Sequence, residues 1–245
     1  MYDRPMSAPG RAASVLDVRD AAEEWRPQLF GSGRARGIDD PLIEPLWAGL
    51  RVLALVDRGE VSIRDLDGET IDEFDLIAGE LAASVATDRI LLDAYLTPQP
   101  VQDLTGIPII DAIEAPKAAQ AINQLWLGKF GRPQRKAPQG PAPEDEGRDP
   151  LPLMDEVAIV IVDLLWLDDD PLVDVPLLER KRVLESVLGE SKLVRRGVYV
   201  RPPVDPWLVS WRSFGFSRLA YKAANSRYLP GETNPQWAIA PIPTR

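Results

Sequence analysis

The sequence predicts an α+β fold in which antiparallel sheets are flanked by helices. Residues 51–57 (RVLALVD) form an apolar run between two charged residues and are followed closely by residues 61–65, a pattern typical of a β-hairpin. Residues 157–167 (VAIVIVDLLWL) are almost continuously apolar, which favours a central strand buried on both faces. Residues 74–85 have apolar side chains at helical spacing, so a helix is expected between strands.

The N-terminal residues predict a mobile arm. Residues 1–40 are rich in Pro, Gly, Arg and Ala, and chain ends of this kind are poorly ordered unless they are anchored. Within the arm, residues 14–25 could form a short helix with Ser14 as its N-cap. Residues 41–245 are expected to form one domain.

The first half of that domain has recognisable turn and cap signals. Arg58-Gly59 predicts the tight turn of the hairpin, and Thr70 with Glu73 predicts a capping box at the start of the helix. Residues 89–96 (RILLDAYL) read as a buried strand. The apolar face of the helix is predicted to contain Phe74, Ile77, Leu81 and Val85.

The middle of the chain predicts an interruption. Residues 115–127 favour a helix, whereas residues 128–152 are dense in Pro, Gly and charge and predict a flexible insertion. Its basic half, residues 129–136, precedes an acidic half at residues 144–149. We interpret this insertion as solvated.

The last third of the chain predicts a helix and further strands. Pro176 stands near the first turn of the helix and Gly189 just beyond its end. Residues 194–200 and 218–223 are predicted strands, joined by a segment rich in Pro and Trp.

The composition excludes most catalytic chemistry. The chain has no Cys and no His, so it has neither a thiolate nucleophile nor an imidazole base, and an ordinary zinc site is not expected. Catalysis by carboxylates or lysine, or no catalysis, remains. We see neither a signal peptide nor a stretch long enough for a membrane span, so a cytoplasmic protein is expected. The net charge of −10 argues against a general affinity for nucleic acid, but it leaves room for a local basic groove.

Two stretches carry a family resemblance. Residues 162–188 resemble the strand, acidic turn and helix of the nucleotidyltransferase (adenylation) domain of ATP-dependent DNA ligases. Residues 218–232 (RLAYKAANSRYLPGE) resemble that family's late strand and the turn after it, with Lys222, Ser226, Tyr228, Pro230 and Gly231 matching. The resemblance covers roughly residues 40 to 241. It implies a ligase-type (ATP-grasp-like) domain that would use ATP and magnesium.

The family's nucleophile motif, K-x-D-G-x-R, is altered in this sequence. Residues 43–57 (IEPLWAGLRVLALVD) occupy its place, and Gly49 and Arg51 match the motif. In the family the lysine attacks the α-phosphate of ATP as a neutral amine. Its position here is Leu46, and the aspartate position is Ala48. The resemblance therefore implies a chain without the covalent nucleophile.

Other family positions that handle ATP also differ. An arginine near the hairpin is replaced by Leu66, and an Asp-Gly-Glu strand end reads Asp93-Ala94-Tyr95. Ser217-Arg218 stands in place of Glu-Gly, and the closing Trp-x-Lys-x-Lys motif has Ile239 and Pro241 in place of its lysines. Only Arg51 and Lys222 remain of the groups that would contact ATP.

We therefore expect a vestigial nucleotide cleft that is narrow and mostly apolar. Arg51 is expected to pair with a carboxylate such as Asp93, and Lys222 to face solvent or an acidic neighbour, or to retain an anion. Consecutive acids such as Asp168-Asp169-Asp170 cannot all point at one ion, so no metal site is expected. Trp207, Trp211 and Trp237 are expected to pack in the core rather than stack on bases. The predicted lining is Leu46, Ala48, Leu66, Tyr95 and Ile239.

Three classes of function stay open. The first is a catalytically inactive scaffold or regulator related to DNA repair, with a protein partner such as an active ligase and weak or no nucleic acid binding. The second is a nucleotide- or anion-binding module, and the third is an active nucleotidyltransferase with an unrecognised lysine. No cofactor and no membrane are expected. Since ligases need an oligonucleotide-binding barrel after this domain and the sequence stops at Arg245, nick sealing is not expected.

Overall fold

A computed structural model describes residues 17–97 and 157–243. The described residues combine helices with mostly antiparallel strands, which confirms the predicted α+β class. Besides a short 3₁₀ turn, η1 (Ala35–Gly37), the helices are α1 (Val18–Glu24), α2 (Asp75–Ser84), α4 (Leu177–Val187) and α5 (Asp205–Ser213).

The largest sheet has six strands in the order β4-β3-β5-β6-β7, with β8 paired to β6. All pairs are antiparallel except β6 with β8. The strands of this sheet are β3 (Leu50–Asp57), β4 (Glu60–Arg64), β5 (Arg89–Thr97), β6 (Ala158–Leu167), β7 (Asp170–Pro171) and β8 (Val194–Arg196).

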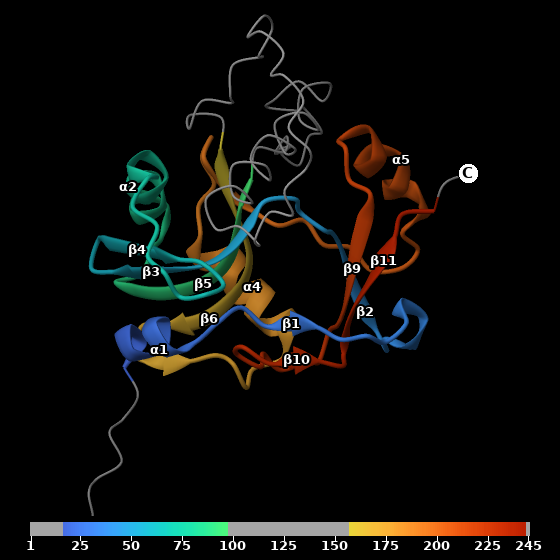
Figure 1. The fold of residues 1–245 in the computed structure, drawn as a ribbon, viewed down its shortest axis with the longest axis horizontal. Helices are drawn as coiled ribbons and strands as arrows, with labels where there is room; N and C mark the ends of the chain where they lie inside the picture. Colours follow the sequence, from blue (N-terminus) through green and yellow to red (C-terminus); the bar gives the residue numbers. More distant parts are fainter. Residues whose placement is uncertain (1–16, 98–156, 244–245) are drawn as a thin grey trace, which may run out of the picture.

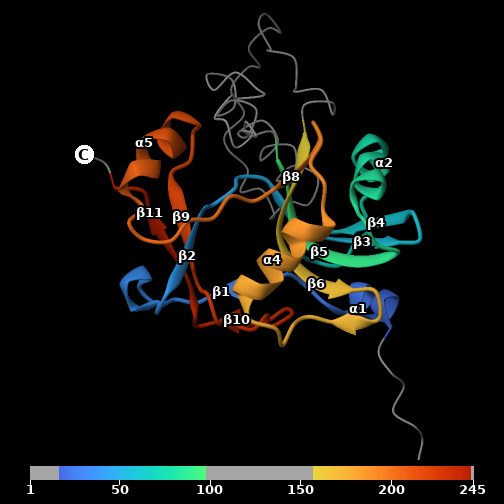
Figure 2. The same cartoon turned by 180° about the vertical axis from the view of Figure 1, so that it is seen from behind.

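A smaller antiparallel sheet has the order β11-β9-β2. Figures 1 and 2 show the two sheets on opposite sides of the molecule, with the short parallel pair of β1 and β10 between them at one end. These strands are β1 (Leu29–Phe30), β2 (Pro41–Pro45), β9 (Arg218–Ala223), β10 (Thr233–Asn234) and β11 (Trp237–Pro241).

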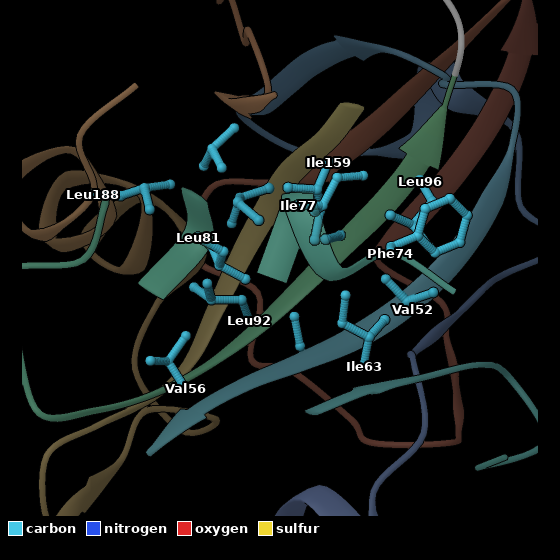
Figure 3. Packing of buried hydrophobic residues seen from close by; sticks show 14 of the residues in the cluster. Val52, Val56, Ile63, Phe74, Ile77, Leu81, Leu92, Leu96, Ile159 and Leu188 are labelled. Carbon is cyan, nitrogen blue, oxygen red and sulfur yellow. The ribbon is translucent and has the colours of Figure 1, made fainter. Parts of the chain in front are cut away.

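One face of the six-stranded sheet carries an apolar core. Ile77 and Leu81 of α2 and Leu184 of α4 pack on strand residues such as Leu92 and Ile159, all of them buried (Figure 3). Because side chains alternate along a strand, the residues between these core positions point to the opposite face. That opposite face lies toward the smaller sheet and carries the charged groups described below.

Helix α1 packs on the opposite face of the six-stranded sheet. Its Val18, Ala21 and Ala22 are buried and belong to one cluster with Leu53 and Leu55 of β3. Residues 17–40 are therefore part of the folded body, and the predicted arm does not extend to residue 40. The apolar spacing within α1 is the physical reason, because it gives this segment a face to bury.

The predicted hairpin and the strands β5, β6 and β9 are confirmed. The hairpin turns at Arg58 and Gly59, which have positive φ angles of 52° and 87°. Strand β5 matches the predicted residues 89–96, and β6 is buried at every position except its last. Helix α4 begins directly after Pro176 and ends before Gly189, as expected. The segment rich in Pro and Trp contains a helix, α5, that the sequence pattern missed.

Two local predictions are wrong. The capping box at Thr70 and Glu73 does not form, because α2 begins at Asp75 and Thr70 forms an isolated bridge with Arg64. The strand predicted over residues 194–200 is short, since pairing with β6 covers only Val194–Arg196. The predicted helix at 115–127 and the insertion at 128–152 lie outside the described residues.

No helix in the described part of the chain has the length and apolar character that a bilayer crossing requires.

The core predicts a contrast between two leucines of the same helix. Leu81 is fully buried in α2 and Leu76 is 65% exposed. We expect Leu81→Ala to lower the free energy of unfolding by about 2–5 kcal/mol, because it removes buried methyl groups and leaves a cavity. Leu76→Ala is the matched control, with an expected change of about 0.5 kcal/mol or less. Urea unfolding measures both, and equal losses would contradict the assigned core face.

Candidate functional site: a buried ionic network between the sheets

Charged side chains meet where the two sheets face each other. The six-stranded sheet contributes Arg51 from β3, Asp93 from β5 and Asp163 from β6. The smaller sheet contributes Glu44 from β2 and Lys222 from β9. All five are buried. Moving a charge from water into a protein interior costs free energy, so buried charges are normally paired. Each of these five side chains has a partner of opposite charge.

Arg51 is held by a carboxylate, a backbone carbonyl and aromatic rings. Its Nε donates to Oδ1 of Asp93 at 3.0 Å, its Nη2 contacts Oδ2, and its Nη1 donates to the carbonyl of Gln28. Burial alone would lower the pKa of Arg51, but the Asp93 carboxylate outweighs it and raises that pKa well above its ordinary value. The guanidinium lies 5.8–6.0 Å from the ring centroids of Phe30, Tyr95 and Trp237.

Tyr228 links this pair to the chain before β1. Its hydroxyl donates to Oδ2 of Asp93 at 2.8 Å and accepts the backbone N–H of Gln28 at 2.9 Å. Burial, followed by the Asp93 charge, raises the pKa of Tyr228 well above its ordinary value. Burial likewise raises the pKa of Tyr95 to about 12. Both phenols therefore stay protonated and neutral at physiological pH.

A second ion pair joins β6 to α4. Nε and Nη2 of Arg180 each donate to a carboxylate oxygen of Asp163 at 2.8 Å, and neither side chain is exposed. Burial alone would raise the pKa of Asp163, but Arg180 outweighs it and lowers that pKa below its ordinary value. Bidentate geometry of this kind makes a strong and directional contact.

Glu44 carries the third ionic contact, and it serves two lysines. Its Oε2 accepts from Nζ of Lys222 at 2.7 Å, and its Oε1 lies 2.7 Å from Nζ of Lys181 in α4. Burial alone would raise the pKa of Glu44, yet the two ammonium groups lower it. Burial lowers the pKa of Lys222, whose Nζ also lies 4.4 Å from the ring centroid of Trp237.

Residues 46–49 connect β2 to β3. Leu46 and Ala48 are half-buried there, and the backbone N–H of Leu46 donates to the carbonyl of Arg218 at 3.0 Å. Trp47 is buried and packs edge-on against Phe216, with ring centroids 4.8 Å apart. Gly49 has a φ of 136°, and a Cβ there would lie 2.2 Å from the carbonyl oxygen of Leu96. The glycine is thus required by a close backbone approach.

The structure brings some of the predicted cleft residues together and separates others. Tyr95 and Lys222 lie in the network around Arg51 and Glu44. Ile239 pairs with Ala220 on β9, so it shares the sheet face of Lys222 and Trp237. Leu66 follows β4 and is 45% exposed.

The described side chains around Tyr95 and Lys222 thus form an ionic network. Sequence reasoning anticipated the pairing of Arg51 with Asp93 and an acidic neighbour for Lys222. It missed Glu44, Lys181, Asp163 and Arg180, which complete the network. A charged residue inside an otherwise apolar strand, as in VIVDLL and LIEP, is the signal that marks such positions.

The remaining candidates are an acidic run and three tryptophans. Asp168 and Asp169 form an exposed turn between β6 and β7, and Asp170, also exposed, is the first residue of β7. Trp211 and Trp237 are buried, whereas Trp207 is 44% exposed. Among the described residues, no group of acids is arranged to hold a metal ion.

These observations limit the chemistry of the described site. A lysine that attacks a phosphate must present a neutral amine to it. The amine of Lys222 instead contacts a carboxylate inside the protein, with its side chain 3% exposed. The arrangement as described holds two sheets together.

The fold is that of the nucleotidyltransferase domain of ATP-dependent DNA ligases. The ligase domain of M. tuberculosis LigD aligns with a TM-score of 0.55 and 20% sequence identity, over 88% of this chain and 58% of that one. A mycobacterial DNA ligase D complexed with ATP and MES gives 0.56 and 20%, over 88% and 59%. A ligase named Pmar-Lig_PreS3 gives 0.53 and 14%, over 89% and 46%.

The chain thus spans less than two thirds of the length of each of these three structures. Comparison with protein-family models and with curated proteins gave no match. The similarity between this chain and the ligase structures is therefore a similarity of fold.

The Glu44 contact predicts both a stability loss and a change in pH dependence. Glu44→Gln leaves two buried ammonium groups without a carboxylate, so we expect a loss of about 3–5 kcal/mol at pH 7. Glu179→Gln is the control, because Glu179 pairs with Arg182 on the surface of the same helix that carries Lys181 and is worth about 0–1 kcal/mol.

The lowered pKa of Glu44 determines how its contribution to stability changes with pH. Its stabilisation is fully present above the unfolded pKa of about 4.3 and is lost as pH falls through the lower folded pKa. Asp163 acts in the same direction. Urea unfolding between pH 7 and strongly acidic pH should therefore show a shallower acid decline for Glu44→Gln than for the wild type. A parallel decline would contradict the assignment.

Proposed function

We propose that this chain is a catalytically inactive protein built on a DNA-ligase nucleotidyltransferase fold, acting in the cytoplasm as a scaffold or regulator related to DNA repair. The observation that carries the proposal is the engagement of Arg51 and Lys222 in buried ion pairs with Asp93 and Glu44. By resemblance these two cations are the remaining groups that would contact ATP.

The residues at the nucleophile turn support the same proposal. Leu46 offers no atom that can attack phosphorus, and Ala48 offers no carboxylate. Loss of a single electrostatic donor costs about 10²–10³ in rate, whereas loss of the nucleophile removes the covalent path. Several losses combined leave the ligase reaction without a route. ATP and magnesium, which the resemblance implies, have no evident role in this chain.

The partner of such a protein would be another protein, with an active ligase or another repair protein as candidates. Retention of the fold without its reagents supports this, because a folded surface can be kept for binding after catalysis is lost. The net charge of −10 supports weak or no binding of nucleic acid.

A second function, a nucleotide- or anion-binding module, is favoured by one observation. Lys181 and Lys222 share a single carboxylate, so the site carries an excess of positive charge.

Incubation with labelled ATP and a divalent metal tests the main proposal. After denaturing electrophoresis we expect no labelled band, since no amine stands at position 46. We expect Leu46→Lys alone to remain unlabelled as well, because Ala48 is unchanged and Lys222 stays bound to Glu44. An active ATP-dependent ligase provides the positive control. A label on the wild-type chain that resists denaturation would contradict the proposal and favour the alternative of an active nucleotidyltransferase.

A further inference from the structure

The buried ionic groups between the two sheets do not balance. Arg51 pairs with Asp93 and Arg180 with Asp163, one cation to one carboxylate in each case. Glu44 alone faces two ammonium groups, those of Lys181 and Lys222, each 2.7 Å away. An unbalanced charge in a buried site is costly, so either a proton leaves or a counter-ion enters.

Lys181 is the less satisfied of the two lysines. An ammonium group has three N–H donors. Nζ of Lys222 makes a hydrogen bond to Glu44 and lies over the ring of Trp237. Nζ of Lys181 forms an ion pair with Oε1 of Glu44, and beyond this carboxylate it has no hydrogen-bond acceptor among the described residues although its side chain is 2% exposed. Buried donors in native proteins are rarely left in this state.

A groove of about 450 Å³ lies against Lys181. It runs between α4 and residues 196–199, and Leu184 and Val198 contribute apolar walls. The size is within the range of pockets that hold small molecules.

The other charged groups of the groove are two carboxylates and one guanidinium. Nη2 of Arg196 lies 3.1 Å from Oε2 of Glu190, whereas Oε1 of Glu185 accepts from the neutral hydroxyl of Tyr199 at 2.9 Å. The excess positive charge is that of the two lysines on Glu44, and Lys181 is the one of them that lines this groove.

We propose that this groove binds a small anion, a carboxylate or inorganic phosphate, with Lys181 as its charged floor. The ring centroid of Tyr199 is 5.4 Å from Nζ of Lys181, so this ring covers the ammonium group. Entry of the anion requires this ring to turn aside, which breaks the surface hydrogen bond from Tyr199 to Glu185. Arg196, which is partly exposed, adds a second cation at the rim.

The alternative explanation of the charge imbalance is that one of the two lysines is neutral. Burial lowers the pKa of Lys222, and loss of its proton would balance Glu44 against Lys181 with no anion. A bound anion and a neutral lysine can be told apart by measurement, because only a bound anion makes stability depend on the identity and concentration of the anion.

Thermal unfolding of the full chain at pH 7 tests the proposal, with inorganic phosphate and acetate titrated against chloride at matched ionic strength. We expect a saturable rise in Tm with phosphate or acetate beyond the chloride baseline. A response to phosphate alone would define a phosphate site, and a response to acetate alone a carboxylate site. Lys181→Met should abolish the saturable response, and Arg182→Met, at the adjacent exposed position, should keep it.

Lys222→Met provides a test that does not depend on altering the groove. It leaves one carboxylate facing one ammonium group, so the fold keeps a balanced pair and the excess charge disappears. We expect anion affinity to fall by roughly tenfold or more, a usual size for coupling between sites. An unchanged affinity in Lys222→Met, no saturable response in the wild type, or equal Tm shifts in every variant would overturn the proposal.

Discussion

The carboxylate of Glu44 is the contact on which the arrangement of the two sheets depends. It lies on β2 and holds Lys222 of the neighbouring strand β9, and it reaches Lys181 on α4, which packs on the other sheet. One side chain thus ties the smaller sheet to the helix layer of the larger one. A buried ionic contact contributes less to net stability than an apolar replacement of equal shape would, but removing one partner is strongly destabilising. Such a contact determines how the sheets and the helix pack together more than it raises the free energy of unfolding.

Local periodicity was enough to predict most of the fold, because burial on one or both faces of a strand leaves a direct pattern in the sequence. The hairpin and the strands β5 and β6 were found in this way. Local cap chemistry was a weaker guide: Thr70 had the right spacing for a cap, but tertiary pairing with Arg64 engages it instead. Residues 17–40 belong to the folded body although this end of the chain is rich in Pro and Gly, because the short helix α1 has an apolar face that packs on the sheet.

The candidate site was predicted less completely, for a physical reason. Arg51 and Asp93 lie on adjacent strands, so their pairing follows from sheet register. Glu44 and Lys181 are 137 positions apart and on different layers, and their contact exists only once the sheets and helices have packed. Their residue types carried the only signal available, because an acid within an apolar strand requires a partner.

Calorimetric titration of the wild-type chain with ATP and magnesium tests the central claim most directly, namely that internal ion pairs occupy the cations a nucleotide would need. If Arg51 and Lys222 are committed to Asp93 and Glu44, ATP must break buried pairs before it can bind. The predicted result is no saturable heat at ATP concentrations up to the millimolar range. Saturable binding with a micromolar Kd, about −8 kcal/mol of binding free energy, would contradict the account and favour a nucleotide-binding protein.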